Sequence, residues 1–295
     1  MLGLIVISML FATVPIAHAG GLGSTGGSSL DLPLLLALAA VVVGWLWAAR
    51  SIGRAHPENP VPRWRTAAFV GGIGALLLAL QSPIDTYADD LFSVHMVQHL
   101  LLGFVAAPLL VLSGPVLLLL RFSRASFRGR VLLPLLRSRA VRVVTHPVVT
   151  WTLFGVVMWA VHFSPLFELA LESEPIHQFE HLLLLGTGYL YWLPAIGSEP
   201  MPTRLGWSGR FVYIFLGMPV SSVLGLVLVA LTDPLYPAYV AASGSAAALA
   251  DQRLAGTVMW VGGDLIGIVL LGVVVWLWLR MESARMRRHS PASEA

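Results

Sequence analysis

The chain has 295 residues, 57% of them apolar and only 11% charged, with a formal net charge of +3. Ordinary soluble domains carry about 25% charged residues, so this composition and a mean hydropathy of +0.81 exclude a soluble domain and make lipid the solvent for most of the chain. The sequence contains no Cys, which excludes disulfides and thiolate metal ligands. All 18 basic residues are Arg in connecting segments, a pattern that does not indicate nucleic acid binding.

Long, continuously apolar runs predict an all-α fold, a polytopic bundle of transmembrane helices. Water is absent from the bilayer core, so the backbone there must satisfy its own hydrogen bonds in helices or in a closed barrel. The runs do not alternate between polar and apolar residues, which favours helices, and each is near the length that spans a bilayer. We expect seven spans, at residues 31–49, 66–82, 94–120, 147–163, 178–196, 211–231 and 255–279.

The ends of the chain differ from this apolar region. A short apolar stretch followed by Ala17-His18-Ala19 is typical of a cleaved secretory signal peptide, and a Gly/Ser-rich linker follows it. The predicted organisation is a signal peptide at 1–19, a linker at 20–29, a membrane domain at 30–280 and a basic cytoplasmic tail at 281–295.

Arginine predicts the orientation of the spans. The segments 50–65, 121–142 and 204–210 and the tail hold seventeen of the 18 Arg residues, whereas the opposite loops hold only Arg253. Positive residues are retained on the cytoplasmic side, so the amino terminus is expected outside and the carboxyl terminus inside. Within the third span, Pro108 and Pro115 predict a kink or an early end.

Histidine collects at the predicted outer ends of three spans. His95 and His99 begin the third span, His162 ends the fourth, and His177 and His181 begin the fifth. Each i,i+4 pair lies on one helix face and can offer two imidazoles to one ion. Ionisable residues are costly in a membrane and normally serve function, so we expect these five to bind a metal or cofactor rather than to act as separate interfacial anchors.

Other side chains extend the candidate site. Thioether and imidazole ligands without thiolate favour Cu(I) over Zn or Mg. Carboxyl and amide groups near the same end could orient the imidazole rings, carry protons or stabilise helix packing. The possible additional ligands or supporting residues are Met96, Gln98, Met158, Glu180, Asp251, Gln252, Met259 and Asp264.

Four ordered motifs resemble the CtaG family of cytochrome c oxidase assembly proteins, which are seven-span proteins of bacterial membranes. They are His95-Met-Val-Gln-His99 with the later Pro108-Leu-Leu and Gly114-Pro115, Trp159-Ala-Val-His162, His177 to His181 with Gly188 and Trp192, and Asp251-Gln252-Arg-Leu-Ala-Gly256 with Met259-Trp260. The resemblance implies copper supply to the oxidase from a site on the outer side of the bacterial plasma membrane. It also implies an oxidase subunit or a periplasmic copper chaperone as partner, and no catalytic turnover.

Two other functions remain open from the sequence. Haem held by one His from each of the third and fifth spans would make an electron-transfer protein, although the doubled His pairs do not suit it. The order His177-Gln-Phe-Glu180-His181 also matches the H-x-x-E-H order of zinc peptidases.

Overall fold

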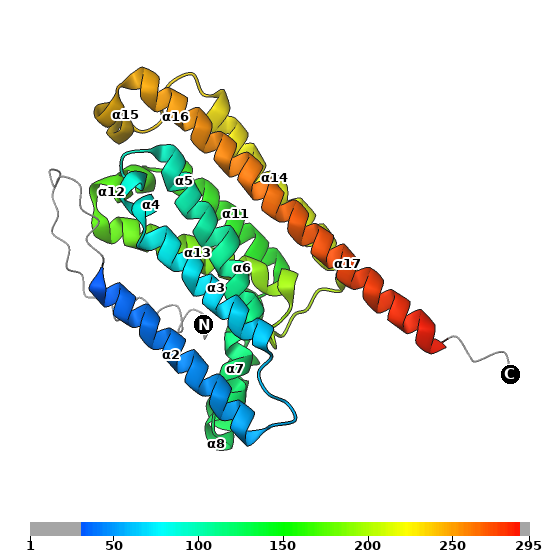
Figure 1. The fold of residues 1–295 in the computed structure, drawn as a ribbon. Helices are drawn as coiled ribbons and strands as arrows, with labels where there is room; N and C mark the ends of the chain where they lie inside the picture. Colours follow the sequence, from blue (N-terminus) through cyan, green and yellow to red (C-terminus); the bar gives the residue numbers. More distant parts are fainter. Residues whose placement is uncertain (1–30, 290–295) are drawn as a thin grey trace.

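A computed structural model describes residues 31–289, so the predicted signal peptide and linker lie outside the described residues. The described chain is helical and without strands (Figure 1). In chain order its helices are α2 (Leu32–Ala55), α3 (Arg63–Leu80), α4 (Pro83–Ala88), α5 (Phe92–Leu100), the π-helical η1 (Leu101–Ala106), α6 (Ala107–Ser113), α7 (Pro115–Phe122), α8 (Ala125–Phe127), the π-helical η2 (Arg128–Leu132), α9 (Leu133–Leu136), α10 (Arg139–Val144), α11 (Pro147–Phe163), α12 (Pro165–Glu172), α13 (Glu174–Ile196), α14 (Trp207–Ala230), α15 (Pro237–Ser243), α16 (Ser245–Thr257), the π-helical η3 (Val258–Gly262) and α17 (Gly263–His289).

Membrane-spanning helices are confirmed in a coarser form than predicted. Five helical stretches are long and apolar enough to cross a bilayer, and α11 with α12, bent by 65° at their junction, brings the number to six. The predicted fifth span at 178–196 is also helical, as α13, but is not among these candidates. Its ionisable first turns lower its apolar content. The five stretches are Leu32–Ala55, Arg63–Leu80, Phe92–Phe122, Trp207–Ala230 and Ser245–Ser283.

Proline with a preceding polar residue begins several helices. Ser82 and Ser164 each accept a hydrogen bond from the backbone N–H two residues later, at the starts of α4 and α12. His146 does the same for α11 through Nδ1. Proline tolerates the first helical turn because its missing N–H needs no partner there. His146 therefore has a structural role, as a helix cap.

The third long helix is interrupted at Gly114, as the prolines predict. Gly114 adopts φ 77°, a left-handed conformation that ends α6 and starts α7 at Pro115. Both oxygens of the buried Glu199, which follows α13, accept hydrogen bonds from the first turn of α7, at Val116 N and Leu117 N. Burial raises the pKa of Glu199 to about 7, although these hydrogen bonds and the nearby Arg65 oppose the shift. A carboxylate from a distant loop thus caps this helix.

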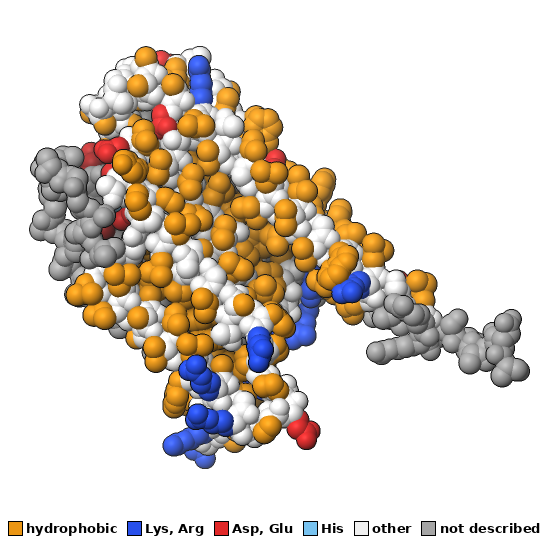
Figure 2. Space-filling model, viewed as in Figure 1, with side chains coloured by type: hydrophobic (Ala, Val, Ile, Leu, Met, Phe, Trp, Pro, Cys, Tyr) orange, Lys and Arg blue, Asp and Glu red, His pale blue; other side chains and the backbone are white. Residues whose placement is uncertain are grey.

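Charge is concentrated at the two ends of the molecule, which we name by their residues. The arginine end carries the loops before α3, between α7 and α11, and before α14, and the histidine end carries α4, α12, α15 and α16. Figure 2 shows blue side chains at the lower end, red ones toward the upper end, and a largely apolar surface between them. This distribution matches a bundle whose middle faces lipid.

Two glycines allow α14 and α16 to pack backbone against backbone. A methyl group at Gly225 would lie 2.4 Å from the carbonyl oxygen of Gly256, and one at Gly256 would lie 2.5 Å from that of Gly225. Small residues at helix crossings permit such close approach in membranes.

Replacing Gly225 by Ala should therefore destabilise the protein. Backbone atoms cannot move aside as a flexible side chain can, so we expect a loss of about 1–3 kcal/mol, typical of overpacking, seen as a lower melting temperature in detergent. Gly272→Ala is the matched control, because a methyl group there meets nothing within 4 Å. Equal melting temperatures for the two variants would contradict the close contact.

Candidate metal centre

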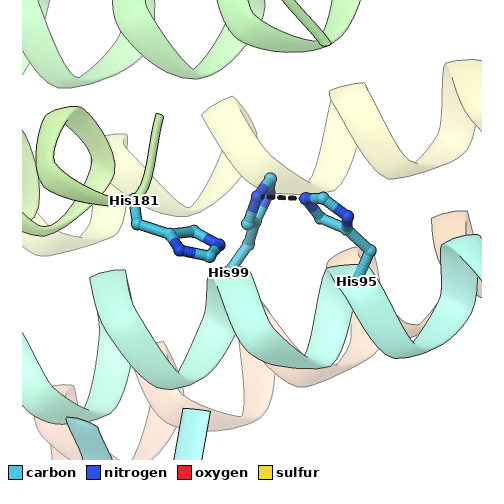
Figure 3. A group of neighbouring side chains, drawn as sticks. All are labelled: His95, His99 and His181. Carbon is cyan, nitrogen blue, oxygen red and sulfur yellow. Dashed lines mark hydrogen bonds between the residues drawn. The ribbon is translucent and has the colours of Figure 1, made fainter. Parts of the chain in front are cut away.

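The two predicted His pairs meet at the histidine end. His95 and His99 project from α5, and His177 and His181 come from the first turns of α13. Figure 3 shows His181 reaching toward His99, with His95 beyond it and bonded to His99. The Nε2 atoms of His95 and His99 are 2.8 Å apart. Ligand atoms of His95, His99 and His181 lie within 4.8 Å of one another, close enough to hold one ion.

Close packing of α13 against the third helical stretch brings the pairs together. A methyl group at Gly188 would lie 3.1 Å from the backbone of Gly103 in η1. One helical turn later, Trp192 Nε1 donates a hydrogen bond of 2.9 Å to the Gly103 carbonyl. Gly188 and Trp192 follow His181 on the same helix, so this contact fixes the height at which the imidazoles meet.

Glu180 lies between the imidazoles and is fully buried. Its Oε2 is 3.7 Å from His95 Nε2, and its Oε1 is 3.5 Å from His99 Nε2. Ligand atoms of Glu180, His95 and His177 also lie within 4.8 Å of one another. Glu180 is therefore a candidate ligand itself, a closer role than the supporting one that the sequence suggested.

Several buried polar atoms of this cluster lack hydrogen-bond partners among the described residues. They are His99 Nδ1, His177 Nε2, His181 Nε2 and both carboxylate oxygens of Glu180. A buried polar atom without a partner costs about 1–3 kcal/mol, and imidazole nitrogen and carboxylate oxygen are both metal ligands. The donor set consequently fits a metal ion, which would satisfy the atoms that the protein leaves unpaired.

His162 lies at the edge of the cluster. Its ring centroid is 5.4 Å from that of His99, and its Nδ1 donates a hydrogen bond of 2.7 Å to the Met158 carbonyl. That hydrogen bond places the proton of a neutral imidazole on Nδ1. The unprotonated Nε2 then faces Met96 Sδ at 3.3 Å, so two electron-pair donors face each other in a fully buried place.

Aromatic side chains from the connecting segments cover the cluster. Phe167 of α12 lies 4.7 Å from the His95 ring and 5.9 Å from the His162 ring, between centroids. Tyr236, at the start of α15, stacks on Phe167 and donates a hydrogen bond to the His162 carbonyl. Tyr239 OH lies 3.4 Å from His95 Nδ1. The sequence analysis missed these three residues; only their position between predicted spans of one end could have indicated them.

Three of the other predicted residues connect helices. Asp251 of α16 accepts hydrogen bonds from Ser93 Oγ at 2.5 Å and Ser93 N at 3.1 Å, and so caps the start of α5. Gln252 accepts a hydrogen bond from Leu235 N, in the segment before α15. Asp264 accepts one from Ser222 of α14. Their described contacts are thus with other elements than the imidazoles.

Met158, Met259 and Gln98 differ in their surroundings. The side chains of Met158 and Met259 are buried in the hydrophobic core. Gln98 is also buried, but its Nε2 donates hydrogen bonds to the Ala79 carbonyl and to Asp85 Oδ1. It therefore joins α5 to α4 and does not orient an imidazole ring.

Comparison with known proteins agrees with this geometry. Residues 42–281 match the family described as the cytochrome c oxidase caa3 assembly factor (Caa3_CtaG). The chain belongs to this family. The match covers every residue of the His/Glu cluster, and the resemblance drawn from the motifs is confirmed.

The relatives found among curated proteins are uncharacterized. One from Mycobacterium bovis and one from Mycobacterium tuberculosis are each 30% identical over 88% of this chain, and one from Mycobacterium leprae is 29% identical. The aligned region is only 41% of each relative, so this family member corresponds to less than half of their length. No solved structure matches the chain significantly.

Replacing Asp251 by Ala should loosen the start of α5. Loss of a capping side chain costs about 0.5–2 kcal/mol, so we expect a lower melting temperature and faster modification of the buried imidazoles by diethyl pyrocarbonate. Asp251→Asn keeps one acceptor oxygen and should lie between Ala and wild type. Unchanged imidazole reactivity in the Ala variant would contradict a positioning role for Asp251.

Proposed function

We propose that this chain is a membrane copper-binding factor that assists cytochrome c oxidase assembly by supplying or inserting copper. The proposed ion site is the cluster of His95, His99, His177, His181 and Glu180, with His162 and Met96 beside it. The observation that carries the proposal is the convergence of unpaired nitrogen and oxygen atoms in a buried, apolar surrounding. The family description supplies the oxidase connection.

The kinds of ligand favour copper. Imidazole binds zinc, copper, iron and nickel alike, whereas a thioether selects Cu(I). The contact between His162 Nε2 and Met96 Sδ adds that soft donor next to the imidazole cluster. A bound ion would supply a positive charge that neutralises Glu180, while the protein excludes water from it with Phe167 and the two tyrosines.

Haem and zinc hydrolysis are weaker alternatives. Haem needs its two axial imidazoles on opposite faces of a macrocycle, whereas the rings of His177 and His181 lie 4.2 Å apart and His95 lies 5.1 Å from His177, between centroids. A hydrolase needs access for water and substrate at Glu180, and that side chain is fully buried. Binding and release of a metal require no turnover, so the proposed role is non-enzymatic.

The proposed topology places this site toward the outside. In it the chain crosses the bacterial plasma membrane seven times, with α13 as the additional span, the amino terminus outside and the carboxyl terminus in the cytoplasm. The Arg-rich segments at the opposite end support this orientation. Copper would then arrive from a periplasmic chaperone, or leave toward an oxidase subunit, at the histidine end.

Detergent-purified protein should bind one Cu(I) per chain, and combined replacement of His95, His99, His177 and His181 by Ala should abolish this binding. We expect an affinity loss beyond the 10–100-fold typical of supporting residues, measured by chelator competition and elemental analysis. His56→Ala, at an exposed position of the arginine end, is the control. No copper in the intact protein would reject the proposal, and zinc content or a haem spectrum of the same sample would identify the alternative.

Met96→Leu should separate soft from hard metals. The substitution nearly conserves volume, so folding should change little. Loss of the thioether should weaken Cu(I) binding about tenfold, at the low end of effects from supporting residues, and leave Zn(II) binding unchanged, because zinc does not depend on this donor. Titration of both metals checks this. An equal loss for both would point to a packing defect.

A further inference from the structure

Three carboxylates lie close together beside the cluster, on the segments that precede α5 and begin α13. Asp85 belongs to α4, Asp89 follows that helix, and Glu174 begins α13. Each lies within electrostatic range of at least one of the others, since Glu174 acts on both Asp85 and Asp89. Burial first, and then these neighbours, raise the pKa of Asp85 to about 7. Asp89 and Glu174 are exposed, whereas Asp85 is half-buried, so the group extends from the surface inward. We call these three residues the acidic group.

A buried amide joins the acidic group to the helix that carries His95 and His99. Gln98 Nε2 donates a hydrogen bond of 2.8 Å to Asp85 Oδ1. The other amide atom, Gln98 Oε1, is buried and has no hydrogen-bond partner among the described residues. A buried amide oxygen without a donor is a ligand atom for a cation. Gln98 has no other role in the ion site.

A second connection runs along α13. Glu174 and His177 are three residues apart, so they lie on neighbouring positions of one helix face, and Glu174 acts electrostatically on His177. His177 is the most exposed imidazole of the cluster, at 6%. Its Nε2 has no hydrogen-bond partner among the described residues. His177 is thus the imidazole best placed to receive an ion from the surface.

We propose that Asp85, Asp89 and Glu174 form a loading site that captures a hydrated metal cation at the outer face and passes it to the His/Glu cluster through Gln98 and His177. The inference rests on the proposed function for the direction of transfer. Carboxylate and amide oxygens bind a cation weakly and exchange it readily, while the imidazoles hold it. Clustered charge raises association rates by roughly 10–1,000-fold, an effect that falls with ionic strength.

The test compares loading rates of two variants with the same change of charge. Asp89→Asn with Glu174→Gln removes two carboxylates of the acidic group, and Glu172→Gln with Asp233→Asn removes two exposed carboxylates of the same end outside it. Aqueous Co(II) is the probe, because imidazole coordination gives it visible absorption that stopped-flow mixing can follow. All four positions are exposed, so both proteins should fold.

We expect the first variant to load Co(II) about tenfold more slowly than wild type and to lose most of the ionic-strength dependence, with a smaller change in equilibrium affinity. The control variant should load at nearly the wild-type rate. Asp85→Asn and Gln98→Met, tested separately, should also slow loading. Equal rates in the two charge variants, or a loss of affinity without a loss of rate, would overturn the loading site.

Equilibrium binding distinguishes failure of this inference from failure of the proposed function. Wild-type protein that binds the ion but loads it at the same rate as the Asp89/Glu174 variant retains the metal centre and excludes the loading site. Wild-type protein that binds neither Co(II) nor copper excludes both.

Discussion

Polar atoms inside an apolar helical bundle must find partners, and at the histidine end they find too few. Hydrogen bonds within each helix satisfy the backbone, but His99, His177, His181 and Glu180 retain unpaired atoms that face one another. The Gly188 contact with Gly103, the Trp192 hydrogen bond and the Asp251 cap all hold this arrangement in place. A protein without a ligand for these atoms would gain stability from apolar residues there, so their presence indicates a bound group.

Periodicity alone predicted much of this site. An i,i+4 spacing places two imidazoles on one helix face whatever the tertiary fold, and the Arg distribution predicted that the faces of α5 and α13 would meet at one end. Glu180 shares the face of His177 and His181 for the same reason. The predicted span limits were also close to the observed helices, because apolar runs and the proline-led starts at Pro147 and Pro165 are local signals.

Tertiary contacts could not be predicted in the same way. Asp251, Gln252 and Asp264 stood out as polar residues near apolar helices, but a sequence does not tell which neighbour such a residue faces. In the structure those neighbours are Ser93, Leu235 and Ser222. Phe167, Tyr236 and Tyr239 were missed because they belong to connecting segments, whose paths depend on the packed bundle. The composition of α13, mixed between ionisable and aromatic residues, also made its status as a span less distinct than that of the other helices.

The cap that Glu199 provides for α7 has a consequence for biosynthesis. Glu199 and Val116 are 83 residues apart in the chain, and all of α11, α12 and α13 lies between them. The first turn of α7 therefore lacks its carboxylate partner until the ribosome has released the segment that follows α13. Completion of the third helical stretch at the arginine end has to wait for the fifth predicted span, so these two segments, which carry the paired histidines, reach their final packing together.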